Sequence, residues 1–165
     1  MSEDLRQLID EAIKMELNVA EVYIGFHHRF REDAAFWWKL AIEEENHAGL
    51  LESGEQYFLD AGMFPGELVD TSLNALVNAN HELERMLIQE REAPMSRESA
   101  FNHAIKLEEL AEEIHFQHAM QEKRNSSESL KVFQSLNAGD KDHADRIRNY
   151  MHQNGIRDLT VALCQ

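Results

Sequence analysis

The sequence contains very little cysteine or proline. Its 165 residues include one cysteine, Cys164, and two prolines, Pro65 and Pro94. A single thiol excludes an intrachain disulfide, a Cys-x-x-Cys redox pair and a four-thiolate iron centre within these residues. Because both prolines lie in loop-like stretches, they leave long segments in which helices can continue without interruption.

Basic residues and long apolar runs are also scarce. The chain has 16 Lys and Arg against 31 Asp and Glu, a formal net charge of −15. Such a charge repels nucleic acids and anionic membrane surfaces, so we expect neither as a partner. No apolar run approaches the ~20 residues of a membrane span, and the opening MSEDLRQLIDEA lacks the pattern of a signal peptide. We therefore expect a soluble, cytoplasmic protein.

Apolar residues recur at helical spacing, and the alternation typical of strands is absent, which predicts an all-α chain. The predicted helices cover about residues 3–29, 31–61, 70–91, 96–122 and 127–154. Length and composition favour one domain over residues 1–155, followed by a C-terminal tail at 156–165 without an evident role.

Two stretches of the chain resemble each other. AIKMELNVAEVY at 12–23 aligns with AIKLEELAEEIH at 104–115, and LAIEEENHA at 40–48 aligns with LNAGDKDHA at 136–144. The helix at 70–91 belongs to neither copy and is typical of a crossover connection. Two duplicated helix pairs joined by a helical crossover predict a four-helix bundle of the ferritin-like type.

The copies carry acids and histidines at matching positions on faces that are otherwise apolar. These residues are Glu16 with Glu108, Glu44 with Asp140, and His47 with His143. Buried carboxylates without partners would cost several kcal/mol each, whereas four carboxylates and two neutral imidazoles balance two divalent cations. Residues i and i+3 can close on one ion, while the single Glu residues bridge or chelate from other helices. This mixed ligand set favours iron, with manganese as the alternative.

The competing interpretation is that these residues lie on solvated helix faces. With 31 acids and 9 histidines, chance alone would give about two acid-x-x-His matches, and the chain has three. The pairs Glu44/His47 and Asp140/His143 occupy matching positions in the two copies, and this repetition favours the metal site over solvated faces. The third pair is Glu112/His115, in which Glu112 is either a seventh ligand or a residue at the bundle rim. His115 occupies the position of Tyr23 and is expected to hydrogen-bond to a ligand.

ELNVAEVY, LAIEEENHAGLL and the EELAEE segment resemble the diiron domain of rubrerythrins, within the ferritin-like superfamily, over about residues 5–153. The resemblance implies a homodimer whose two irons react with hydrogen peroxide or oxygen, with electrons from a separate carrier protein. The six ligands that it implies are Glu16, Glu44, His47, Glu108, Asp140 and His143. It also places Tyr23 beside these ligands.

The chain departs from the rubrerythrin pattern at several positions. Asp140 replaces a glutamate and is one methylene shorter, His115 stands where tyrosine is common, and Ala111 stands where rubrerythrins place another carboxylate. Glu112 would have to replace that carboxylate. The chain also lacks the four cysteines of a rubredoxin-like domain, so electrons would have to come from another protein.

These observations leave three hypotheses. The first is a diiron oxidoreductase that reduces peroxide or oxygen. The second is iron binding, with ferroxidase or storage activity and no peroxidase turnover. The third is a structural helical dimer with vestigial carboxylates, for which retention of metal binding after loss of Glu44 and His47 would be evidence.

Overall fold

The computed structural model describes residues 2–69, 72–93, 95–109, 128–136 and 143–159, and the regular elements within these ranges are helical. They are α1 (Ser2–Arg29), the 3₁₀ turn η1 (Arg31–Asp33), α2 (Ala34–Gly54), the π-helical η2 (Glu55–Leu59), the 3₁₀ turn η3 (Gly66–Val69), α3 (Leu73–Glu92), α4 (Arg97–Glu108), α6 (Glu128–Leu136) and α7 (His143–Gln153). The all-α prediction is confirmed for these residues. None of the described helices is both long enough and apolar enough to cross a membrane.

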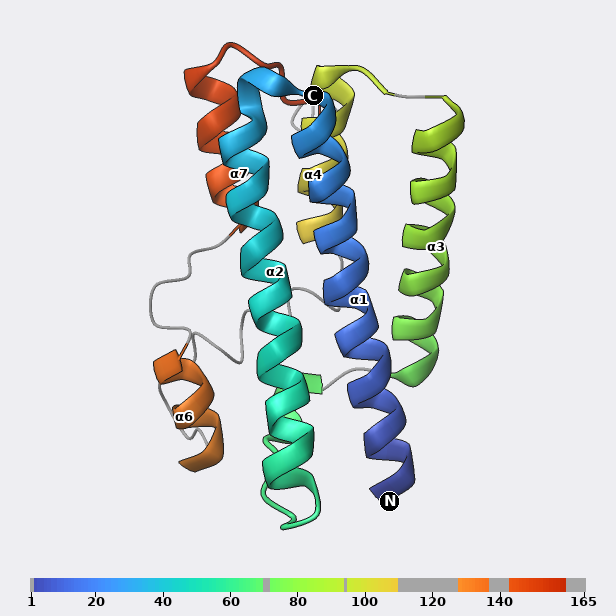
Figure 1. The fold of residues 1–165 in the computed structure, drawn as a ribbon, viewed down its shortest axis with the longest axis vertical. Helices are drawn as coiled ribbons and strands as arrows, with labels where there is room; N and C mark the ends of the chain where they lie inside the picture. Colours follow the sequence, from blue (N-terminus) through green and yellow to red (C-terminus); the bar gives the residue numbers. More distant parts are fainter. Residues whose placement is uncertain (1, 70–71, 94, 110–127, 137–142, 160–165) are drawn as a thin grey trace.

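The two longest helices form the centre of the arrangement. Helices α1 and α2 pack side by side, and α3 packs against α1 on the side away from α2 (Figure 1). Helices α4 and α7 contact each other at one end of the molecule, and α6 lies toward the other end of α2 (Figure 1). Helices α3, α4, α6 and α7 are therefore arranged around α1 and α2.

Several predicted boundaries agree with the structure. The α1 range matches, and Ser96 caps α4 by accepting a hydrogen bond from the Ser99 amide. Gly62 and Gly155 adopt φ values of +66° and +64°, which suit glycine and end the preceding helices. The predicted helix at 31–61 is divided into η1, α2 and η2. Parts of the predicted helices at 96–122 and 127–154 lie outside the described residues.

The inward face of α2 is buried as its periodicity predicts. Five residues lie on this face and are at most 2% exposed: Trp37, Ala41, Glu44, His47 and Leu51. Trp37 stacks on Tyr23 of α1 at 5.6 Å between ring centroids and lies 4.4 Å from Phe101 of α4. One indole thus joins three helices above the acidic residues of α2.

The apolar residues of α3 are buried to different degrees. Leu76 and Leu83 are buried against α1, but Ile88 is 55% exposed. Ile88 therefore lies off the face of α3 that packs against α1. Asn80 is buried, and its Oδ1 accepts a hydrogen bond from the Asn18 amide at 2.9 Å.

A buried ion pair joins the starts of α2 and α4 to the last part of α7. The Asp33 side chain is buried, and Arg97 donates to both of its oxygens at 2.7 Å. The Tyr150 hydroxyl donates to Oδ1 of Asp33 at 3.0 Å. A bidentate arginine and a third donor satisfy a carboxylate that would otherwise be costly to bury. The contacts fix α4 and α7 against α2, which helps to align Glu108 and His143 with Glu44.

The segment after α7 packs against α4 through Asn102. Its amide nitrogen donates to the Arg157 carbonyl at 2.8 Å, and its oxygen accepts from the Leu159 amide at 2.7 Å. Ile156 is buried beside it. The tail, for which the sequence indicated no role, therefore covers α4 up to Leu159.

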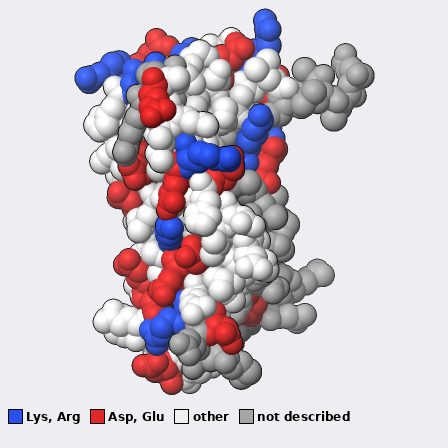
Figure 2. Space-filling model, turned by 90° about the vertical axis from the view of Figure 1, so that its right-hand side faces the viewer, with Lys and Arg blue, Asp and Glu red and all other residues white. Residues whose placement is uncertain are grey.

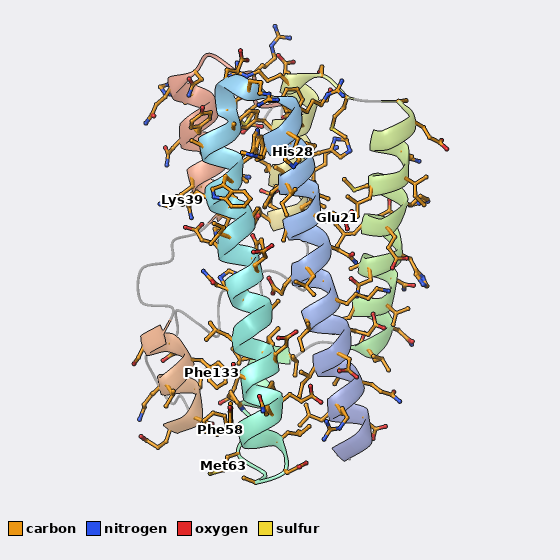
Figure 3. All side chains as sticks on the ribbon, in the orientation of Figure 1. Glu21, His28, Lys39, Phe58, Met63 and Phe133 are labelled. Atoms are coloured by element: carbon orange, nitrogen blue, oxygen red, sulfur yellow. The ribbon has the colours of Figure 1, made fainter. Side chains whose placement is uncertain are left out.

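Gly54 lies where α6 approaches the end of α2. A Cβ atom at this position would lie 2.8 Å from Phe133 and 2.9 Å from Phe64. Phe133 also packs on Phe58, with ring centroids 5.9 Å apart, between α2 and α6 (Figure 3). The contact of α6 with α2 therefore requires glycine here.

Gly54→Ala is expected to lower the free energy of unfolding by about 1–2 kcal/mol, because overpacking outweighs the better helix propensity of alanine. Gly49→Ala on the same helix is the matched control, since nothing lies within 4 Å of its added Cβ. That change should be neutral or mildly stabilising. Urea unfolding of both variants measures the difference, and equal effects would contradict the close approach of Phe133.

The face formed by α1 and α3 carries charges of both signs. Acidic and basic side chains alternate around an uncharged central area (Figure 2). Lys14 of α1 pairs with Glu84 of α3 at 2.7 Å across this face. On this side of the molecule, the excess of acids does not gather into one acidic patch.

Candidate metal centre

Buried acids and histidines from four helices converge beneath Trp37. None of them is more than 2% exposed: Glu16 from α1, Glu44 and His47 from α2, Glu108 from α4 and His143 from α7. Each projects from the buried face of its helix, because the apolar residues one turn away are themselves in the core. The structure thus brings together five of the predicted ligands. Asp140, Glu112 and His115 lie outside the described residues.

The five side chains form two groups that could each hold a metal ion. One is Glu16, Glu44 and His47, and the other is Glu44, Glu108 and His143; within each group the ligand atoms lie within 4.8 Å of one another. The two imidazole rings are nearly parallel, 5.6 Å apart at an interplanar angle of 15°. The two candidate groups therefore lie side by side.

Glu44 belongs to both groups. Its Oε2 lies 3.1 Å from Nδ1 of His47, and its Oε1 lies 2.7 Å from Nδ1 of His143. The sequence predicted that the single Glu residues either bridge or chelate, and in the structure the residue common to both groups is Glu44, a member of a Glu-x-x-His pair. Glu44 has this position because one of its oxygens faces His47 of its own helix and the other faces His143 of α7.

The acids of the site have perturbed pKa values. Burial raises the pKa of Glu16 to about 7, although His47 partly offsets this effect. Burial and the charge of Glu44 also raise the pKa of Glu108. Burial would raise the pKa of Glu44 as well, but His143 and His47 hold it below its usual value. The carboxylate between the histidines therefore stays ionised, and the outer two hold their protons more readily.

This ligand set fits divalent cations. Oε2 of Glu16 accepts no hydrogen bond from the described residues, and the nearest imidazole nitrogen, Nδ1 of His47, is 3.4 Å away. When Glu16 and Glu108 are both ionised, a cation would supply the positive charge that balances them. Carboxylate oxygens with imidazole nitrogens suit iron, manganese and zinc.

Tyr23 lies against the site, as predicted. Its buried hydroxyl donates a hydrogen bond to Oε1 of Glu108. This bond favours the ionised form of Glu108 and leaves Oε2 facing His143. Tyr23 therefore orients the carboxylate and lowers the cost of deprotonating it.

Tyr23→Phe is expected to weaken metal binding by about tenfold or more, because a hydrogen bond to a charged group contributes roughly 1.5–3 kcal/mol. Tyr57→Phe is the matched control, since Tyr57 is 68% exposed. Calorimetric titration of the metal-free proteins with Zn²⁺ gives the two affinities. Equal affinities in Tyr23→Phe and the unaltered chain would show that the hydroxyl does not support the ligand.

Two residues beside the site were not identified from the sequence. Glu43 contacts His143 with Oε2 at 3.3 Å from Nε2, and Arg146 donates to the same carboxylate. Glu43 is one of three consecutive glutamates, so only the tertiary structure distinguishes it from the exposed Glu45.

Comparison with known proteins gives no further guidance. No family model, curated protein or solved structure matches this chain. The feature of the chain that points to a function is therefore the site itself, where buried Glu and His side chains could hold metal ions.

Proposed function

We propose that this chain is a diiron oxidoreductase that reduces hydrogen peroxide or oxygen with electrons from a separate protein. The observation that carries the proposal is the position of Glu44 between His47 and His143, which makes two ligand groups continuous. A single structural ion would require only one of these groups. Two adjacent sites rich in carboxylates are suited to a pair of redox-active ions.

The proposed architecture is a ferritin-like four-helix bundle. The first helix pair is α1 with α2, and the second is represented by α4 with α7, which contact each other. Helix α3 would be the crossover, consistent with its place outside α1 (Figure 1). The duplicated sequence supports this assignment, because Phe133 and Ile147, the counterparts of Trp37 and Leu51, are buried like them.

In the proposed centre, Glu16, Glu44 and His47 hold one ion and Glu44, Glu108 and His143 hold the other. When bound, a diferrous pair would supply the two electrons that, with two protons, reduce hydrogen peroxide to two waters. The protein contributes a dry, prearranged ligand cage in which Trp37 and Tyr23 form one wall. The Tyr23 hydroxyl holds a proton beside Glu108.

A separate electron donor and a homodimer are further parts of the proposal. The one cysteine in these 165 residues cannot build a four-thiolate iron centre, which supports a donor site outside them. A homodimer is part of the proposal by resemblance to rubrerythrins. Iron storage is the alternative, which cage-sized assemblies and iron loading far above two ions per chain would favour.

The experiment is anaerobic loading with Fe²⁺ followed by rapid mixing with hydrogen peroxide or with oxygen. We expect about two irons per chain and the consumption of one peroxide for each pair of ferrous ions, faster than for Fe²⁺ in buffer. Glu45→Gln should behave like the unaltered chain, since Glu45 is exposed. A chain that binds no iron, or that leaves the rate of oxidation unchanged from buffer, would contradict the proposal.

A further inference from the structure

The imidazole of His143 lies between two consecutive glutamates of α2. Its Nδ1 faces the site, 2.7 Å from Oε1 of Glu44 and 3.4 Å from Oε2 of Glu108. Its Nε2 faces the other way, 3.3 Å from Oε2 of Glu43. The two ring nitrogens of one buried histidine therefore have separate tasks, one toward the ligand group and one toward Glu43.

Glu43 is itself held from α7. Arg146, one turn after His143, donates a hydrogen bond to Oε2 of Glu43, the oxygen that also faces the imidazole. The two side chains are 19% and 18% exposed, so solvent only partly screens the pair. Lys39 lies on the α7 side of α2 (Figure 3), with its Nζ 3.9 Å from Oε1 of Glu43. Glu43 is thus fixed at the edge of the site.

We propose that Glu43, fixed by Arg146, is a positioning residue for the ion held by Glu44, Glu108 and His143. An imidazole binds a metal through a nitrogen that carries no proton, so its single proton must reside on the other nitrogen. By accepting a hydrogen bond from Nε2, Glu43 keeps the proton there and leaves the Nδ1 lone pair for the metal. The inference rests on the proposed metal function of the site.

The Glu43–Arg146 pair belongs to one half of the duplicated chain. In the alignment of the two copies, Glu43 corresponds to Gly139 and Arg146 corresponds to Leu50. Neither counterpart carries an ionisable group, so the same pair cannot form at His47. Loss of Glu43 should therefore affect one of the two ions and not the other.

The test is calorimetric titration of the metal-free chain with Zn²⁺ in three variants. Glu43→Ala should weaken one of two binding steps by about 10–100-fold, the usual cost of losing such an outer contact, and leave the other step unchanged. Glu43→Gln should retain part of the affinity, because its amide oxygen still accepts a hydrogen bond. Glu45→Ala removes the same charge from an exposed position and should match the unaltered chain.

A spectroscopic measurement separates positioning from general loss of structure. Long-range ¹H–¹⁵N spectra of the Zn²⁺-loaded chain should place the His143 proton on Nε2, and this signal should shift or broaden in Glu43→Ala. If Glu43→Ala weakened both Zn²⁺-binding steps equally, or bound Zn²⁺ with the same two affinities as the unaltered chain, this inference alone would be overturned. Failure of the unaltered chain to bind Zn²⁺ would overturn the proposed function together with it.

Discussion

Replacing Glu44 with glutamine should abolish the binding of both ions. Glu44 is the one described side chain that belongs to both ligand groups, with one oxygen facing each histidine. Glutamine keeps the size of the side chain but removes its charge and places a donor beside a cation. The loss of affinity should therefore exceed the roughly 10–100-fold that follows removal of an outer contact.

The measurement is the shift in thermal unfolding caused by Fe²⁺ or Zn²⁺, together with the number of ions bound at saturation. An ion present at about 1,000 times its Kd stabilises the folded state by about 4 kcal/mol, and Glu44→Gln should lose this gain. His143→Ala should instead affect one ion more than the other. Two ions retained in Glu44→Gln would contradict the shared position of this residue.

Replacing Glu16 with glutamine should stabilise the metal-free chain at alkaline pH while weakening metal binding. The pKa of Glu16 is raised from 4.5 to about 7 by burial. Between these values the folded chain binds more protons than the unfolded chain, so stability falls as the pH rises. Above pH 7 the ionised group costs about 3 kcal/mol, at about 1.4 kcal/mol for each pKa unit.

Glu16→Gln removes the titrating group, so its gain in unfolding free energy should approach about 3 kcal/mol at pH 8 and vanish near pH 4.5. Urea unfolding of metal-free protein at the two pH values measures this difference. Asp10→Asn, an exposed change on the same helix, should leave the pH dependence unaltered. A parallel pH dependence in Glu16→Gln and the unaltered chain would show that burial of this acid is not costly.

The two expected effects of Glu16→Gln, a more stable metal-free chain and weaker metal binding, amount to a trade-off between stability and function. A carboxylate that destabilises the empty site is useful only where a cation offsets its cost. A purely structural helical protein would gain by losing Glu16, whereas a metal protein would lose a ligand.

The sequence could predict the parts of the fold that depend on local pattern. Helical spacing placed Glu44 and His47 on a face that is otherwise apolar, and both are buried. The alignment of the two copies matches Phe133 and Ile147 with Trp37 and Leu51, and all four residues are buried. Such predictions succeed because the spacing of side chains on a helix is fixed by its geometry.

Other features depend on neighbours that are distant in sequence. The need for glycine at Gly54 arises from the approach of Phe133 in α6, and the exposure of Ile88 depends on which face of α3 packs against α1. The bridging position of Glu44 and the contact of Glu43 with Arg146 depend on how α7 meets α2. Local spacing cannot distinguish three consecutive glutamates by such contacts.

The central claim is that two metal ions, proposed to be iron, occupy adjacent groups that share Glu44. Elemental analysis of protein from iron-replete cells, combined with anomalous scattering from its crystals at the iron and manganese edges, tests it most directly. The predicted result is about two irons per chain, one beside Glu16 and His47 and the other beside Glu108 and His143. A metal-free chain, or an anomalous peak away from Glu44, would contradict it.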